Sequence, residues 1–188
     1  MEFEFLDSLQ EDWQSLSKVA LAAWLVFYAL FLGYAALTRS QFLFIDVVFV
    51  PIHEGGHLLL GWFGQWPGVL GGTLLQLGVP VALAVFFVFQ RQLPGTALCI
   101  FFCFENFLGI ATYMADSLAQ EGNYVTVGDG GDTIHDWFFI FSNLGLLDHF
   151  LLIARLTRTL GWLGMIATVA WLAYRGKQRL ASYSSGCE

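Results

Sequence analysis

Residues 19–37 read VALAAWLVFYALFLGYAAL, a run of 19 residues without a charged side chain. A helix needs about 20 mainly apolar residues to cross the hydrocarbon core of a bilayer. This run therefore predicts a membrane-spanning helix, and similar runs follow it along most of the chain.

The composition of the whole chain agrees with a membrane protein. Of its 188 residues, 57% are hydrophobic and only 12% are charged. Soluble domains carry about 25% charged residues, so an ordinary water-facing surface cannot be built from this sequence. The formal net charge of -7 gives no basic field, and we expect no nucleic acid partner.

Four further apolar runs predict spans, at residues 42–63, 69–90, 95–119 and 159–174. Residues 137–153 are also apolar, but polar side chains interrupt them, so they either lie at the membrane interface or pack re-entrantly. The expected fold class is all-α, a polytopic membrane helical bundle of about five transmembrane helices with additional interfacial helices.

We expect a single integral membrane domain over residues 1–188. Its predicted parts are an interfacial N-terminal segment at 1–18, a core at 42–119, a polar loop with an amphipathic or re-entrant helix at 120–158, and a last span with a cytoplasmic tail at 159–188.

Lysine and arginine are enriched in the cytoplasmic loops of membrane proteins. With five spans and the N-terminus outside, the residues predicted in the cytoplasm are Arg39, Arg91, Arg175, Lys177 and Arg179. Those left outside are Lys18, Arg155 and Arg158. The sequence thus favours a multi-pass protein of the plasma or inner membrane with a cytoplasmic C-terminus.

The strongest chemical motif is His53-Glu54-Gly55-Gly56-His57, an HExxH sequence within the second predicted span. On a helix, residues four apart share a face, so both imidazoles can reach one metal ion. Glu54 is turned by about a quarter-circle from His53, where a base for water activation would lie. The alternative is a polar cluster that lines a helix interface. Ionisable residues are costly inside a membrane, which favours metal binding, most simply of Zn²⁺.

Asp46 precedes His53 by seven residues and lies on nearly the same helical face. It is a candidate to hold a ligand histidine through the free ring nitrogen. A simple contact with another helix explains this carboxylate equally well.

A second polar stripe runs along the span at residues 95–119. Its members are Glu105, Asn106, Tyr113 and Asp116, whose spacings superimpose on one helical face. Asp116 is a candidate third metal ligand, or it marks the water-facing end of the span. Asn106 is a candidate catalytic residue that donates a hydrogen bond to a substrate carbonyl, or it holds two helices together.

Residues 128–137 read GDGGDTIHDW and provide further candidate ligands. Asp132 could cap a following helix and place His135 and Asp136 in its first turn. We take His135 as a candidate ligand, with a plain turn and helix cap as the alternative. The residues therefore leave Asp116, Asp132, His135 and Asp136 open as the groups that complete the metal site.

Together these motifs resemble the site-2 protease type of intramembrane zinc metalloprotease. The likeness covers residues 42–119 and rests on the HExxH helix, the Gly71-Gly72 span that follows it, and a span with Asn106 and Asp116 on one face. The resemblance implies that His53, His57 and Asp116 bind zinc, that Glu54 activates water, and that Asn106 matches the asparagine of the family's core.

The expected function is therefore an intramembrane zinc metallopeptidase that hydrolyses peptide bonds of membrane-embedded segments. Its expected partners are the lipid bilayer and a membrane protein substrate. The alternative is a non-catalytic subunit of a larger membrane complex, with a structural metal or none. A haem held by His57 and His135 ranks last, because it explains neither Glu54 nor the spacing of the two histidines.

Overall fold

The structure is a computed structural model that describes residues 13–38, 43–121 and 135–185, with side chains as far as residue 180. Within these residues the chain is all-α, as predicted. The elements are α2 (Lys18–Thr38), α3 (Asp46–Leu60), η1 (Gly61–Phe63), α4 (Gln65–Phe89), α5 (Leu93–Ala115), α6 (Asp136–Leu144), η2 (Leu147–His149) and α7 (Phe150–Ser185), where η marks a short 3-10 turn.

Four helical segments in the described part of the chain are long and apolar enough to cross a membrane. They are Lys18–Thr38, Gln65–Phe89, Leu93–Ala115 and Leu147–Leu180. The prediction that residues 42–63 form a span, the second of the five expected, is corrected, because α3 has only 15 residues. At about 1.5 Å per residue it is roughly 22 Å long, short of the roughly 30 Å hydrocarbon core.

The helical part of this predicted span ends at a glycine, although the side chains just before that glycine are apolar. After η1, Gly64 has φ 115°, a backbone conformation that other residues rarely adopt. The chain therefore turns sharply, and α4 begins at the next residue.

The C-terminal region also differs from the prediction. The ambiguous run at 137–153 is divided: α6 ends at Gly145, which is left-handed with φ 67°, and the rest of the run leads into α7. The last helix is consequently longer than the predicted span at 159–174.

Of the predicted interfacial segment, residues 1–12 lie outside the described residues, and residues 13–17 are not helical. Gln14 there donates to the backbone carbonyl of Gln90, at 2.8 Å. This bond ties the segment to the end of α4. Most of the predicted polar loop, residues 122–134, also lies outside the described part.

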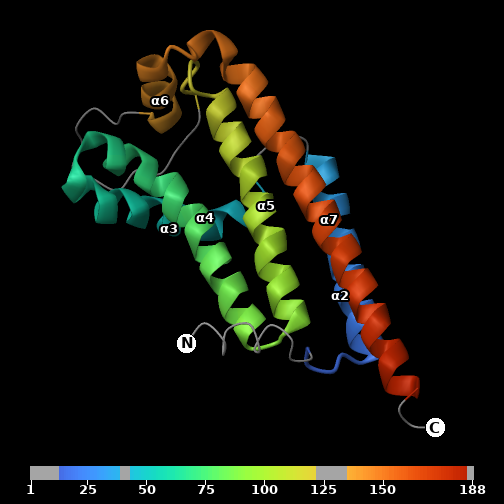
Figure 1. The fold of residues 1–188 in the computed structure, drawn as a ribbon. Helices are drawn as coiled ribbons and strands as arrows, with labels where there is room; N and C mark the ends of the chain where they lie inside the picture. The colour runs from blue at the N-terminus through green and yellow to red at the C-terminus, as the bar shows by residue number, and fades with distance from the viewer. Residues whose placement is uncertain (1–12, 39–42, 122–134, 186–188) are drawn as a thin grey trace.

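The long helices pack side by side (Figure 1). α5 runs antiparallel to both α4 and α7, and α2 lies against α7. The largest core joins α2, α5 and α7 through buried side chains that include Tyr28, Phe101, Met165 and Leu172. A second core lies under α6, where Ile140 and Phe141 pack against Ile110 of α5.

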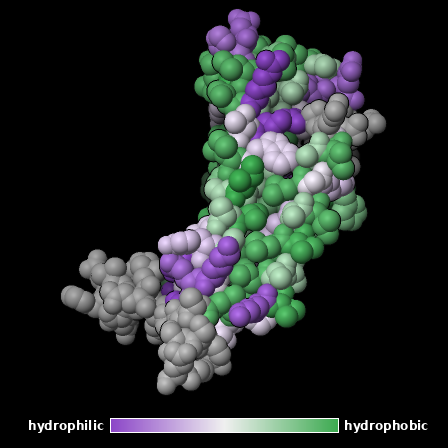
Figure 2. Space-filling view, turned by 90° about the vertical axis from the view of Figure 1, so that its right-hand side faces the viewer, coloured by the Kyte–Doolittle hydropathy of each residue, from purple (hydrophilic) through white to green (hydrophobic). Residues whose placement is uncertain are grey.

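The outer surface of the bundle is apolar, as a membrane environment requires. Figure 2 shows hydrophobic residues over the middle of one face, with hydrophilic residues gathered toward its two ends. Exposed side chains on the long helices include Leu30, Val81 and Leu163. Such a belt has the distribution expected of a lipid-facing surface.

The short helix α3 packs against the first half of α4 (Figure 1). Glycines line this crossing, and a Cβ at Gly56 or at Gly71 would overlap the backbone of the other residue. The two helices therefore touch backbone to backbone, as small residues allow in membrane proteins. This close contact brings the histidines of α3 against α4.

Candidate metal centre

His53 and His57 lie one turn apart on α3, and their rings face a common point. The ring centroids are 4.7 Å apart. Asp136, in the first turn of α6, places its Oδ2 atom 3.1 Å from Nε2 of His53 and 3.2 Å from Nε2 of His57. These three residues form a group that could hold a metal ion.

The distances suit a small tetrahedral ion such as zinc. Bonds of about 2.0–2.1 Å to a tetrahedral Zn²⁺ put neighbouring ligand atoms about 3.3 Å apart. The two separations from the Asp136 oxygen, 3.1 and 3.2 Å, are close to that value. Two imidazoles and one carboxylate are also a frequent donor set for metals of this size.

The far side of each imidazole fixes which nitrogen carries a proton. Nδ1 of His57 lies 2.8 Å from the backbone carbonyl of Gly68. A carbonyl oxygen can only accept a hydrogen bond, so Nδ1 of His57 must donate. In the neutral ring this leaves Nε2 with a lone pair that points at Asp136.

A chain of hydrogen bonds gives His53 the same orientation. Nδ1 of His53 lies 2.9 Å from Oε1 of Gln76, and the Gln76 amide nitrogen donates to Oδ1 of Asn106 at 2.6 Å. The Asn106 amide nitrogen donates in turn to the backbone carbonyl of Phe102 at 2.7 Å. Because this last acceptor is a carbonyl, every amide in the chain is oriented, and Nδ1 of His53 must donate to Gln76.

Two neutral imidazoles therefore direct lone pairs at a carboxylate oxygen. Three electron-rich atoms at these distances repel one another unless a positive charge lies between them. Protons on the histidines would supply it, and so would a metal ion. The hydrogen bonds on the Nδ1 side are those that metal-ligating histidines usually make.

The pKa of Asp136 is lowered and the pKa of His57 is raised, so both shifts favour the charged form of the side chain. Burial raises the pKa of the Asp136 carboxyl, but when His53 and His57 are protonated at Nε2, their hydrogen bonds and charges lower that pKa by more. Burial lowers the pKa of His57, yet Asp136, the Gly68 carbonyl and the charge of Glu54 outweigh burial and raise it. The site thus holds a carboxylate that favours a cation at its centre.

Gly72 on α4 leaves room for that cation. A Cβ at Gly72 would lie 2.5 Å from Nε2 of both His53 and His57. Any side chain there would take the space directly in front of both nitrogen lone pairs. The residues present therefore fit a bound metal ion: the donors converge, and the helix that faces them has no side chain at the point of convergence.

Asp136 is positioned by contacts on both sides of the α6 N-terminus. Nδ1 of His135 caps the helix by accepting from the backbone N–H of Phe138 at 3.3 Å. The hydroxyl of Tyr113 on α5 accepts from the backbone N–H of Asp136 at 3.3 Å. The ring of Tyr113 also packs against His135, with centroids 4.2 Å apart. A carboxylate in the first turn is favourable for the helix dipole.

The predicted ligands Asp116 and His135 do not join the group. Nε2 of His135 lies 3.9 Å from Oδ2 of Asp116, and Oδ1 of Asp116 accepts from the backbone N–H of Glu121 at 3.2 Å. Burial lowers the pKa of His135 by more than nearby carboxylates raise it. Of the alternatives left open, Asp136 is the one that the structure places on the histidines. Asp132 lies outside the described residues.

The other predicted residues have defined places. Glu54 is half-buried on α3, and its charge acts on His57. Asn106 is completely buried within the hydrogen-bond chain to His53, rather than facing the ligand atoms. Asp46 does not hold a histidine, because the Nδ1 atoms are bonded to Gln76 and Gly68.

Gln76 is the functional residue that sequence reasoning missed. Its signal is a single buried amide in the middle of an apolar helix, and such a group needs a polar partner. The sequence alone does not say that the partner is His53.

Comparison of the chain with models of known protein families, with characterised proteins and with solved structures found no match. The resemblance to site-2 proteases therefore rests on the motifs of this sequence alone.

Replacement of Gly72 tests the space for the ion. Gly72→Ala places a methyl group 2.5 Å from both Nε2 atoms, so we expect at least a tenfold loss of metal affinity. Gly78→Ala is the matched control on the same helix, because a Cβ there meets nothing within 4 Å. Metal content of the detergent-purified chains, measured by plasma mass spectrometry, checks this. Equal metal content in the two variants would refute the assigned ion position.

The hydrogen-bond chain to His53 gives a second prediction. Gln76→Leu removes the acceptor of Nδ1, and losing such a partner costs about 10–100-fold in metal affinity. Asn106→Leu should cost less, because Asn106 acts through Gln76. Gln90→Leu makes the same chemical change at an exposed residue after α4 and should bind metal normally. Titration with Zn²⁺ against a competing chelator measures all three, and a Gln76→Leu affinity equal to that of the control would contradict the assigned role.

Proposed function

We propose that this chain is a multi-pass membrane metallopeptidase with a zinc centre at His53, His57 and Asp136, which hydrolyses peptide bonds of membrane-embedded segments. The observation that carries the proposal is the convergence of two imidazoles, each with its Nδ1 committed to an acceptor, on one carboxylate oxygen. This arrangement calls for a cation, and Glu54 adds an acid–base group beside it.

The number of protein ligands supports catalysis over a purely structural metal. Structural zinc sites are closed by four protein ligands, whereas catalytic sites have three and an open position. The described residues supply three. When bound, the metal would polarise a substrate carbonyl and lower the pKa of water.

Glu54 is suited to proton transfer at this centre. It follows His53 directly, so its side chain leaves α3 about 100° around the helix from that ligand. Its charge acts on His57, which is the most exposed of the three candidate ligands. We assign Glu54 to take a proton from the attacking water and to return it to the leaving amine.

Two histidines and one carboxylate also hold iron in some oxygenases. Glu54 favours hydrolysis in this chain, because a general base next to the metal is needed to activate water and has no evident use in oxygen chemistry. A non-catalytic subunit of a membrane complex is the other outcome that the experiment below would reveal.

Asn106 supports the proposed reaction from a distance. It is completely buried and reaches the ligands only through Gln76. In this proposal Asn106 orients His53 through Gln76. We therefore no longer assign Asn106 as the hydrogen-bond donor to a substrate carbonyl.

The helix count changes the proposed orientation. Four crossings put Lys18 and Leu180 on the same side of the membrane, whereas five would have separated the two ends. Lys18 begins α2, and Arg91 lies between α4 and α5. Arg175, Lys177 and Arg179 lie in the last part of α7, and these element ends lie at the same end of the bundle in Figure 1. Arg155 and Arg158 lie near the start of α7, at the other end of the bundle. Arg39 lies outside the described residues. By the positive-inside rule both ends of the described chain are cytoplasmic.

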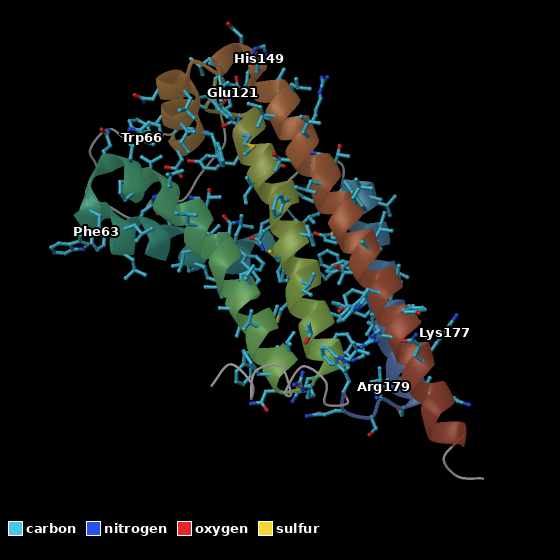
Figure 3. The ribbon with its side chains drawn as sticks, viewed as in Figure 1. Phe63, Trp66, Glu121, His149, Lys177 and Arg179 are labelled. Atoms are coloured by element: carbon cyan, nitrogen blue, oxygen red, sulfur yellow. The ribbon has the colours of Figure 1, made fainter. Side chains whose placement is uncertain are left out.

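The metal centre then lies toward the opposite, external side. Figure 3 shows Lys177 and Arg179 at one end of the bundle and Glu121 and His149 at the other. α6, which carries Asp136, lies at the end with Glu121 (Figure 1). A site near one membrane surface can receive water, which hydrolysis within a bilayer requires.

Labelling of introduced cysteines tests this orientation. In a chain whose three cysteines are replaced by serine, Glu121→Cys should react with a membrane-impermeant maleimide on intact cells. Lys177→Cys should react only after permeabilisation. Both residues are exposed, so accessibility within the fold does not distinguish them, and the reverse pattern would show the opposite orientation.

Replacement of Glu54 tests the enzymatic proposal. Glu54→Gln should retain one zinc per chain but lower cleavage of fluorescently labelled single-span model peptides at least 100-fold, the lower range for loss of a general base. His53→Ala should lose both zinc and cleavage. Glu121→Gln, a change at an exposed residue six positions beyond α5, serves as the control.

The two readouts separate the possible failures. Cleavage by Glu54→Gln at the wild-type rate would remove Glu54 from the mechanism. Stoichiometric zinc in wild type without cleavage of any peptide in the panel would favour a structural metal in a membrane complex.

A further inference from the structure

A second group of ionisable side chains is buried away from the metal ligands, where α3 begins against α5. Asp46 is 4% exposed and Glu105 is completely buried. Asp46 Oδ2 accepts from the backbone N–H of Leu43 at 2.5 Å. The other Asp46 oxygen and both Glu105 oxygens have no hydrogen-bond partner among the described residues.

The Asp46 carboxyl reaches α5 one turn from Glu105. Asp46 Oδ1 lies 2.7 Å from the position that a Cβ at Gly109 would occupy. Gly109 follows Glu105 by four residues, so the two share a helical face one turn apart. The missing side chain at Gly109 thus lets the Asp46 carboxyl reach the surface from which Glu105 extends.

Basic side chains do not neutralise this pair in the described part of the chain. Arg158 on α7 contacts α5 at Thr112, seven residues and about 10 Å along the helix beyond Glu105. α4 presents the neutral amide of Gln76, bonded to Asn106.

The remaining titratable neighbours are uncharged at neutral pH. α2 presents Tyr28, whose ring packs against Phe101 one turn before Glu105. Cys103 lies on α5 itself. Phenol and thiol groups are neutral in their ordinary state near pH 7, so neither offsets the charge of a carboxylate.

Two adjacent buried carboxyl groups without a counter-ion cannot both be ionised, because each charge loses its hydration and repels the other. We propose that Asp46 and Glu105 form a proton-binding pair, which retains one proton between a carboxylic acid and a carboxylate and so joins α3 to α5. The proton comes from water, and its O–H donates to the partner oxygen, as in other coupled carboxyl pairs.

A proton fits these donors better than a metal ion. Hard cations such as Ca²⁺ and Mg²⁺ take six or more oxygen ligands, whereas three carboxyl oxygens here lack partners. A shared proton needs only two.

This pair secures the beginning of the metal-binding helix. Asp46 precedes His53 by seven residues on α3, and Glu105 adjoins Asn106, the anchor of the hydrogen bonds to His53. The folded pair holds its proton more tightly than the unfolded chain does. Its contribution to stability is therefore present at lower pH and is lost as the pH rises through the point where the pair ionises. This inference concerns a site other than the metal centre and stands independently of the proposed activity.

Infrared spectroscopy of the full-length purified protein tests the pair. A carboxylic acid has a C=O stretching band that a carboxylate lacks. At neutral pH, where free aspartate and glutamate are ionised, we expect one such band in wild type. Glu105→Gln should remove it. Asp46→Asn leaves Glu105 buried and should retain the band at a shifted frequency, because the partner oxygen is gone, and the exposed control Glu121→Gln should leave it unchanged.

A thermal series over rising pH provides a second readout. Wild type should lose melting temperature as the acid band disappears, and Glu105→Gln should lack this step, because its amide cannot ionise.

Isotope labelling assigns the band even if a variant does not fold. In wild type, ¹³C-carboxyl labelling of glutamate or of aspartate must shift the band in at least one case. Absence of the band at neutral pH in wild type would overturn the proposal. A band that neither substitution changes, or that shifts with neither label, would do the same.

Discussion

The close crossing of α3 and α4 is the constraint on which the candidate metal centre depends. Because Gly56 and Gly71 put backbone against backbone, the face of α3 that carries both histidines lies directly on α4. The carbonyl of Gly68 then reaches His57, and Gln76 reaches His53. Gly72 completes the arrangement by leaving the space before both Nε2 atoms empty of side chain. This one packing contact thus sets the distance of both histidines from α4, the tautomers of their rings and the space in front of their Nε2 atoms.

Local spacing was sufficient to predict the parts of this arrangement that one helix determines. The HExxH motif placed both histidines on one face, and apolar runs located all four long helices. The second predicted span was wrong because Trp62 and Phe63 continue the apolar run, while the helix ends in the backbone conformation of η1 and Gly64. Hydropathy measures side chains and does not report where the backbone turns.

The third ligand could not be fixed from sequence for a related reason. Asp116 lies on the same helical face as Asn106, which made it a reasonable candidate, but it lies at the end of α5 beside His135. Asp136 reaches the histidines because α6 docks onto α4 and α5, a tertiary contact made across many intervening residues. Asn106 shows the same limit: its spacing was visible, but its bond to Gln76 depends on how α4 and α5 pack.

The three side chains that could hold a metal ion differ in their exposure. The Asp136 side chain is 8% exposed and that of His53 14%, whereas that of His57 is 26% exposed. The open side of the site therefore faces His57. This is also the side where the charge of Glu54 acts. α3, with 15 residues, is too short to cross a bilayer, so lipid does not have to cover it along a full membrane thickness. In the proposed peptidase, water would reach Glu54 and the metal from this more exposed side, while the hydrogen-bond chain on the buried side would hold His53 in place.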